Sequence, residues 1–185
     1  MSASSSKSIV NDYINYRVEK SGHTWEGCPP LDEPCKIHFT MRTLGDEFEE
    51  RYHDRFDDMC DQLHVTPNTA YPTFLGVINE LFVDGVKWGR IVALFSFGGA
   101  LAVRSIEKDM PELVDNIVEW VTKYLDNNLS QWIANHGGWD GFVEFYENGP
   151  ERINESPWPS LKQICGYAAG AIGVLTLGAI LTQKS

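Results

Sequence analysis

The chain has 185 residues, 43% of them hydrophobic, and its 15 Lys and Arg against 26 Asp and Glu give a formal net charge of -11. That length suffices for one domain with a real core but hardly for two. Nucleic-acid binding needs a basic face that displaces counterions, so the acidic balance excludes that class and favours partners with basic surfaces or basic helices. The 6 Trp, 7 Tyr and 9 Phe argue against intrinsic disorder.

The cysteines and the N-terminal residues indicate a cytosolic protein with reduced thiols. The 4 cysteines form no CxxC pair and the histidines are scattered, so we expect neither a metal site nor a cofactor. The first 25 residues hold no apolar run beyond Ile9-Val10, which predicts that there is no secretory signal.

Apolar residues recur at helical spacing along the chain, and no segment alternates as a strand does. The stripes lie at residues 9–18, 37–48, 74–82 and 113–125, with two short ones around 132–133 and 142–146. Residues 91–103 are apolar on every face, which predicts the buried central helix of a globule. As a helix this run is only about 20 Å long, too short to span a membrane. The predicted fold class is all-α, a globular bundle of about eight helices around a central apolar helix.

Two glycine-containing sites interrupt good helices and call for an explanation. Gly98 and Gly99 in the central run cost about 1–2 kcal/mol of helix propensity, so close packing there must compensate. Gly45 and Asp46 interrupt the stripe at 37–48. We expect a neighbour to pack against the backbone at the glycine and an arginine to meet the acid.

The far end of the sequence predicts a membrane anchor. Residues 164–181 carry no charge, and as a helix they would extend about 27 Å, close to the ~30 Å hydrocarbon core. Lys162 and Lys184 flank them, and Trp158 stands where an interfacial aromatic would. The alternative, a helix of a soluble core, fits poorly after the Pro-rich break at 156–159. We therefore expect a helical bundle at 1–155 and a linker with a C-terminal transmembrane tail anchor at 156–185.

Four segments, in order, resemble the homology segments of the Bcl-2 family of apoptosis regulators. Met41-Arg-Thr-Leu-Gly-Asp-Glu-Phe48 resembles the third segment, and Glu80-Leu-Phe-Val-Asp-Gly-Val-Lys-Trp-Gly-Arg-Ile91 with Phe97-Gly-Gly99 resembles the first. Trp132-Ile-Ala-Asn-His-Gly-Gly-Trp-Asp140 with Phe142–Tyr146 is similar to the second. Residues 9–25 are similar to the fourth, the least specific. The resemblance covers nearly the whole chain.

The resemblance implies a bundle whose hydrophobic surface groove receives the amphipathic death-domain helix of a partner, a helix-in-groove mode of recognition. Arg90 is expected to pair with the aspartate of the ligand's Leu-x-x-x-Gly-Asp core, and Gly89 to let its backbone approach closely. The chain's own death-domain segment comprises Met41, Leu44, Gly45, Asp46 and Phe48. The implied groove residues are Phe48, Arg51, Tyr52, Phe56, Met59, Val77, Glu80, Leu81, Trp88, Gly89, Arg90, Val92, Ala93, Phe97 and Tyr146.

Three departures from the family pattern stand out. Lys87 replaces the usual Asn and cannot accept a hydrogen bond, whereas Asn suits a helix N-terminus and can also bond the ligand. Arg55 stands where a smaller or acidic residue is usual. The link at 26–36 lacks the long loop of some relatives.

The resemblance implies an anti-apoptotic regulator that binds pro-apoptotic relatives and restrains permeabilisation of the mitochondrial outer membrane. Residues 95–101 and 110–117 resemble the pro-survival branch; the alternative is a pore-forming effector of the same family. Expected partners are death-domain ligands, pore-forming effectors, a second copy of the chain, and the membrane. The expected location is the cytosolic face of the mitochondrial outer membrane, with the endoplasmic reticulum, the nuclear envelope and a cytosolic pool as alternatives.

An enzyme is the alternative from another class. His53, Asp54, Asp57, Asp58 and Asp61 include pairs that share a helix face and could act as metal ligands or acid/base groups. No glycine-rich phosphate loop follows a strand and no G-x-S-x-G is present, so we interpret these residues as a solvated acidic face. A membrane channel would need a second spanning segment.

Overall fold

A computed structural model describes residues 4–62 and 64–148, and within these ranges all regular structure is helical, which confirms the predicted all-α class for that part of the chain. Because α5, η1 and α6 follow without a break, the described elements form six continuous helical stretches, fewer than the roughly eight predicted. The predicted tail anchor lies outside the described residues. The elements are α1 (Ser6–Lys20), α2 (Lys36–Gln62), α3 (Ala70–Leu81), α4 (Trp88–Glu107), α5 (Leu113–Tyr124), the π-helical segment η1 (Leu125–Leu129), α6 (Ser130–Asn135) and α7 (Gly138–Asn148).

The Gly45-Asp46 pair lies inside the 27-residue α2 and does not end the helix. The lower number of helices has a local cause. The short helix predicted around residues 132–133 is joined to α5 by η1, in which a π-helical turn inserts extra residues without breaking the helical path.

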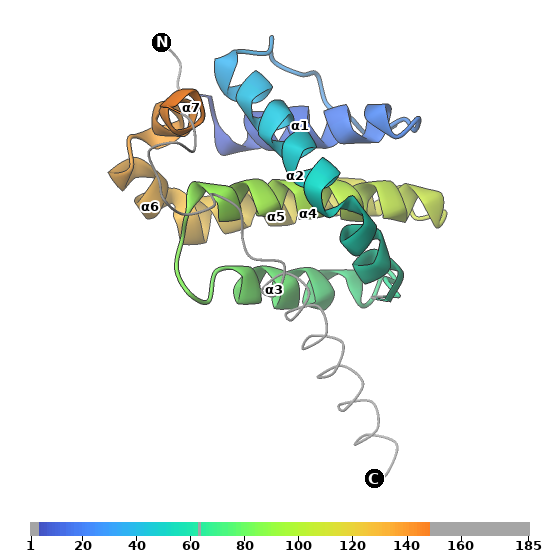
Figure 1. The fold of residues 1–185 in the computed structure, drawn as a ribbon. Coiled ribbons are helices and arrows are strands. Elements are labelled where there is room, and N and C mark those ends of the chain that lie inside the picture. Colours follow the sequence, from blue (N-terminus) through green and yellow to red (C-terminus); the bar gives the residue numbers. More distant parts are fainter. Residues whose placement is uncertain (1–3, 63, 149–185) are drawn as a thin grey trace.

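Helix α4 is the buried centre of the described fold. It crosses the middle of the molecule between α1 and α3, and α2 runs obliquely across it (Figure 1). By length and composition α4 could cross a membrane, yet 78% of its apolar stretch is buried inside the protein. The central apolar helix predicted at 91–103 is confirmed, although its 20 residues extend about 30 Å. Burial, and not a short length, therefore identifies it as a core helix.

The glycine pair of α4 lies where neighbouring helices approach closely. A Cβ on Gly98 would lie 3.0 Å from Val121 of α5, and one on Gly99 would lie 3.1 Å from Arg17 of α1. The close packing predicted at this pair is confirmed.

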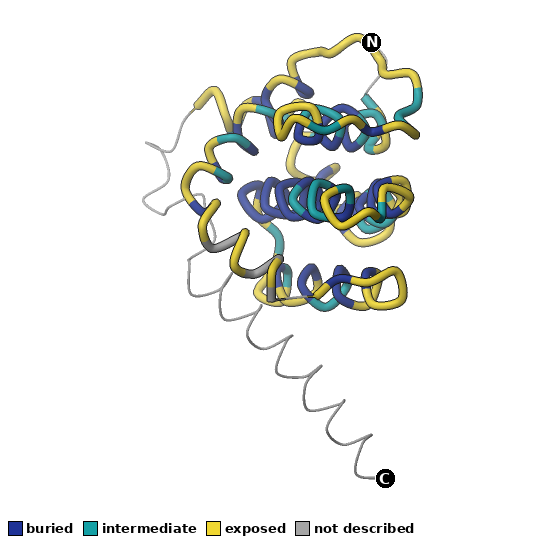
Figure 2. Tube along the Cα trace, turned by 90° about the vertical axis from the view of Figure 1, so that its right-hand side faces the viewer, coloured by how far each residue is buried: buried dark blue, intermediate teal, exposed yellow. Residues whose placement is uncertain are grey.

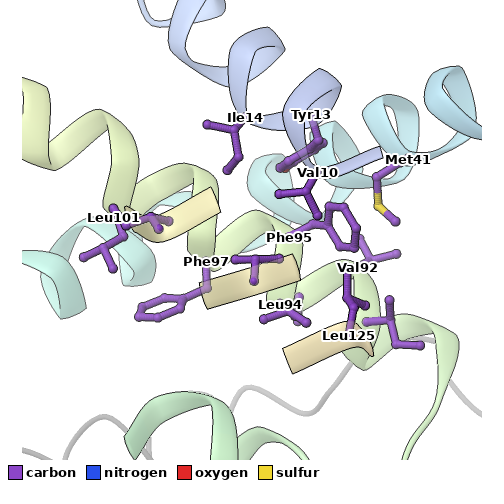
Figure 3. Close-up of a cluster of buried hydrophobic side chains, with 14 of the residues drawn as sticks. Val10, Tyr13, Ile14, Met41, Val92, Leu94, Phe95, Phe97, Leu101 and Leu125 are labelled. Atoms are coloured by element: carbon purple, nitrogen blue, oxygen red, sulfur yellow. The ribbon is translucent and has the colours of Figure 1, made fainter. Parts of the chain in front are cut away.

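The core between α1 and α4 consists of fully buried apolar side chains. Val10, Tyr13 and Ile14 of α1 point toward α4 (Figure 3). The ring of Tyr13 meets that of Phe95 edge to face, with centroids 5.7 Å apart. Full burial of one large apolar side chain contributes about 1.5–3 kcal/mol, so this interface holds α1 firmly. Buried positions gather along the inner sides of the three layers of helices (Figure 2).

Candidate functional site

Residues 41–48, the predicted death-domain segment, pack their apolar side inward. Met41 and Phe48 are fully buried in the core and Leu44 nearly so. A Cβ on Gly45 would lie 2.5 Å from the ring and hydroxyl of Tyr13. The expectation that a neighbour packs against the backbone at this glycine is confirmed, because α1 comes so close that a methyl group has no room.

Asp46 meets α1, but not through an arginine. The hydroxyl of Tyr16 donates to one of its carboxylate oxygens at 2.5 Å, and the ammonium of Lys20 donates to the other at 2.9 Å. The predicted arginine partner was therefore wrong. Burial raises the pKa of Tyr16 and the bond to Asp46 raises it further, and the same carboxylate raises the pKa of Lys20. Each donor thus holds its proton more tightly than it would in an unfolded chain.

Further ion pairs fix α2 against α1. The guanidinium of Arg42 forms a two-pronged pair with Asp12, at 2.8 Å and 2.5 Å, and the Asp12 side chain is 3% exposed. Arg17 lies 3.3 Å from Glu49, the residue directly after the segment. The polar residues that mark the segment are therefore engaged by α1, and its apolar residues lie in the core.

Sequence reasoning missed these partners on α1, although a signal was present. Asp12, Tyr16 and Lys20 are spaced four residues apart, which places them on one face of a helix. This helix face presents an acid, a phenol and a base in turn. It is complementary to a neighbouring helix that carries a base, Arg42, and an acid, Asp46. The pattern predicts an interhelical contact, but it does not say which helix makes it.

The N-terminal end of α4 holds the predicted polar centre. Lys87 occupies the N-cap position and its side chain makes no capping bond to the backbone, as expected for a residue without an acceptor. Gly89 is buried, and Arg90 is 8% exposed. The Nη1 of Arg90 donates to the backbone carbonyl of Gly85 at 2.7 Å.

Trp88 lies in a cluster of aromatic rings formed with the segment at 132–142. Its ring centroid is 4.9 Å from that of Trp132, 6.0 Å from Trp139 and 5.3 Å from Phe142. A Cβ on Gly141 would lie 1.9 Å from the carbonyl oxygen of His136, so only glycine fits there. Helices α6 and α7 therefore support the start of α4 through these rings.

The other predicted groove residues come from four helices. The rings of Phe48 and Tyr52 of α2 are tilted against each other with centroids 4.7 Å apart. Phe74 of α3, which the prediction did not include, has its ring centroid 6.1 Å from that of Phe97 of α4. The side chains of Phe56, Met59 and Arg55 lie outside the described part. Buried members are Phe48, Tyr52, Val77, Leu81, Val92, Ala93 and Phe97; exposed members are Arg51, Glu80 and Tyr146.

Comparison with known proteins decides the family. Residues 41–139 match the family model described as apoptosis regulator proteins of the Bcl-2 family. The chain belongs to the Bcl-2 family. It is 48% identical to the apoptosis regulator Bcl-2 of Gallus gallus over 86% of this chain and 67% of that protein. It is 36% identical to Bcl-2-like protein 1 of Gallus gallus over 98% of the chain and the whole of that protein. It is also 40% identical to the apoptosis regulator R1 of Xenopus laevis, over 97% of the chain and 79% of that protein.

The Bcl-2 family match spans the death-domain segment, the start of α4 and the aromatic segment up to Trp139. Each of these three places holds a glycine or a charged residue in a close contact. The protein is therefore an apoptosis regulator by family, and the resemblance inferred from its motifs is confirmed.

Two of the acidic residues considered as enzyme groups have polar or charged partners. The Nε2 of His53 lies 3.0 Å from a carboxylate oxygen of Asp54, and Asp61 forms an ion pair with Arg104 of α4 at 2.6 Å. Among the residues that the structure describes, no three His, Cys, Asp or Glu side chains are grouped so that they could hold a metal ion. The arrangement is that of a charged helix surface with one link to α4.

Proposed function

We propose that the protein is an anti-apoptotic regulator that binds the death-domain helices of pro-apoptotic relatives and thereby restrains permeabilisation of the mitochondrial outer membrane. The relatives named apoptosis regulator Bcl-2 and Bcl-2-like protein 1 support this direction of action. The alternative is a pore-forming effector of the same family, with which it would share fold and groove.

The observation that carries the proposal is the position of Arg90. It is a nearly buried cation in the first turn of α4, two and three residues before the buried Val92 and Ala93. A ligand helix that buries apolar side chains beside it would place the aspartate of its Leu-x-x-x-Gly-Asp core on this guanidinium. The resulting pair is shielded from water and therefore stronger than a surface ion pair.

The proposed affinity follows from burial. Four apolar ligand side chains, each contributing about 1.5–3 kcal/mol, bring a gross gain of roughly 6–12 kcal/mol. Association and ordering of the ligand helix offset part of this gain, which leaves a net affinity in the nM-to-μM range. Among the groove residues named from the sequence, the exposed Arg51, Glu80 and Tyr146 would contact the ligand first, and the buried members would have to be uncovered to supply apolar surface. The proposal involves no catalysis and no cofactor.

The test is charge reversal at Arg90. In Arg90→Glu the ligand's aspartate faces a like charge in a partly desolvated site, so affinity is expected to fall by about 30-fold or more. A peptide whose aspartate is replaced by arginine should bind Arg90→Glu better than it binds the wild type. This crossover separates a direct pair from general damage, because a damaged site would reject both peptides.

Lys87 provides the necessary control, because a second cation close by in sequence could hold the aspartate alone. Arg90→Glu is therefore measured both alone and combined with Lys87→Asn, with thermal unfolding as a check on folding. Unchanged affinity in both variants would contradict the proposed binding mode.

A further inference from the structure

The guanidinium of Arg90 is already oriented by the backbone before any ligand is present. Its Nη1 donates to the carbonyl of Gly85 at 2.7 Å, and the whole residue is 8% exposed. Because the arginine lies in the first turn of α4, the bond ties this turn to the loop that precedes the helix. A guanidinium has five N–H donors, so after one bond to a carbonyl enough N–H groups remain to bind both oxygens of a carboxylate.

The direction of that carbonyl depends on glycine. Gly85 has a φ of +110°, a backbone conformation that residues with a Cβ rarely adopt. A Cβ at this position would meet nothing within 4 Å, so space for a side chain is not what requires glycine here. Glycine is required because of the positive φ, and this backbone conformation sets the position of the carbonyl that Arg90 contacts.

We propose that Gly85 is a positioning residue for ligand binding: its carbonyl holds the Arg90 guanidinium ready to take the aspartate of a death-domain helix. This inference rests on the function proposed above. A long arginine side chain otherwise loses conformational freedom when a ligand arrives, and a side chain fixed beforehand avoids that loss. The competing interpretation is that the carbonyl masks Arg90 and must be displaced by the ligand.

The two interpretations predict opposite effects of Gly85→Ala. An alanine disfavours the positive φ and turns the carbonyl away without filling any occupied space. If the carbonyl positions Arg90, affinity for an aspartate-containing peptide falls by about two- to tenfold, the range expected for ordering one flexible side chain. If the carbonyl masks Arg90, affinity rises, and that result would overturn the proposal.

The experiment uses the full chain in lipid nanodiscs and two synthetic peptides with the Leu-x-x-x-Gly-Asp core, one with the aspartate and one with alanine in its place. Gly22→Ala is the matched control. Gly22 also has a positive φ, +84°, and an open Cβ position, but it follows α1 and has no bond to Arg90. For Gly85→Ala the loss should be confined to the aspartate peptide, with the alanine peptide within about twofold of wild type. Gly22→Ala should bind both peptides as the wild type does.

A second measurement keeps the proposal testable if Gly85→Ala does not fold. In the wild type without ligand, nuclear magnetic resonance of a ¹⁵N-arginine sample should show hindered rotation of the Arg90 guanidinium. A freely rotating guanidinium would overturn the positioning role.

If the wild type does not distinguish the two peptides, the proposed function fails together with this inference. Arg90→Ala should lose the preference of the wild type for the aspartate peptide over the alanine peptide. If it does so but Gly85→Ala keeps that preference in full, only the inference about Gly85 fails.

Discussion

Gly45 decides how closely α1 and α2 can approach. A Cβ there would lie 2.5 Å from Tyr13, a fully buried side chain, so the ring has little room to move away. In the same family segment, Asp46 is bonded to Tyr16 and Lys20. Both residues of the pair that interrupts the apolar stripe are therefore accounted for by the same neighbour, α1.

Gly45→Ala is expected to lower the free energy of unfolding by about 1–3 kcal/mol, because overpacking outweighs the gain in helix propensity. The measurement is urea unfolding followed by circular dichroism. Gly76→Ala in α3 is the matched control, since a Cβ there meets nothing within 4 Å. It should leave stability unchanged or raise it by up to about 1 kcal/mol. Equal effects in both variants would contradict the close approach of α1.

The bonds to Asp46 make stability sensitive to alkaline pH. The pKa values of Tyr16 and Lys20 are raised above their ordinary values of 10.0 and 10.5, so both bind protons more tightly when folded. Their contribution is complete below those values and is lost as pH rises through the raised pKa values. The double variant Tyr16→Phe, Lys20→Met should have a smaller loss of stability over this range, measured by urea unfolding at successive pH values. Tyr146→Phe, in an exposed position, is the control; an unchanged slope in the double variant would count against these bonds.

At the scale of elements, the sequence predicted which helix lies at the centre of the fold better than it predicted which residues that helix contacts. An apolar run on every face suffices to identify α4 as the core helix, because such a run must be covered by others. The ends of α4 were not predictable, since Trp88 and Arg90 at its start are buried through contacts with α6, α7 and the preceding loop. The π-helical η1 was missed because local propensity favours a break there.

The candidate site was predictable only in part for a related reason. Motif matching named Arg90 and the segment at 41–48, but their partners lie far along the chain or on the backbone. Asp12 is 30 residues from Arg42, and the Gly85 carbonyl has no side-chain signal at all. Contacts of this kind depend on the packed arrangement of helices and not on local spacing.

The pair between Asp12 and Arg42 should be a main support for α1 on α2. Asp12→Ala is expected to cost about 2–4 kcal/mol of unfolding free energy, somewhat below the range for a fully buried pair, because Arg42 is 24% exposed and can be rehydrated. The double variant Asp12→Ala, Arg42→Ala should lose less than the sum of the single losses. Strictly additive losses would show that the pair makes no direct contribution. The surface pair of Glu119 and Lys123 on α5 is the comparison, and Glu119→Ala should have no measurable effect.

At the scale of the whole molecule, the described helices form a bundle around a buried helix, and the proposed membrane anchor is a separate segment at 164–181. Since the apolar stretch of α4 is largely buried, it is committed to the core in this fold. We therefore propose that membrane attachment depends on the C-terminal segment alone.

Deleting all residues after Ser160 should release the protein to the cytosol, measured by cell fractionation. Helix content by circular dichroism and affinity for the death-domain peptide should be unchanged, or the affinity somewhat higher. Full membrane association of the deletion variant would contradict the proposed anchor and direct attention back to α4.

The central claim, that the protein restrains permeabilisation and does not cause it, is tested most directly by dye release from liposomes of mitochondrial lipid composition. A pore-forming relative and its activating death-domain peptide release the dye, and adding the full-length protein should suppress that release, whereas Arg90→Glu should suppress it much less. The protein with the peptide but without the effector should release no dye. Release at the level of an effector in that last arm would contradict the account and favour the pore-forming alternative.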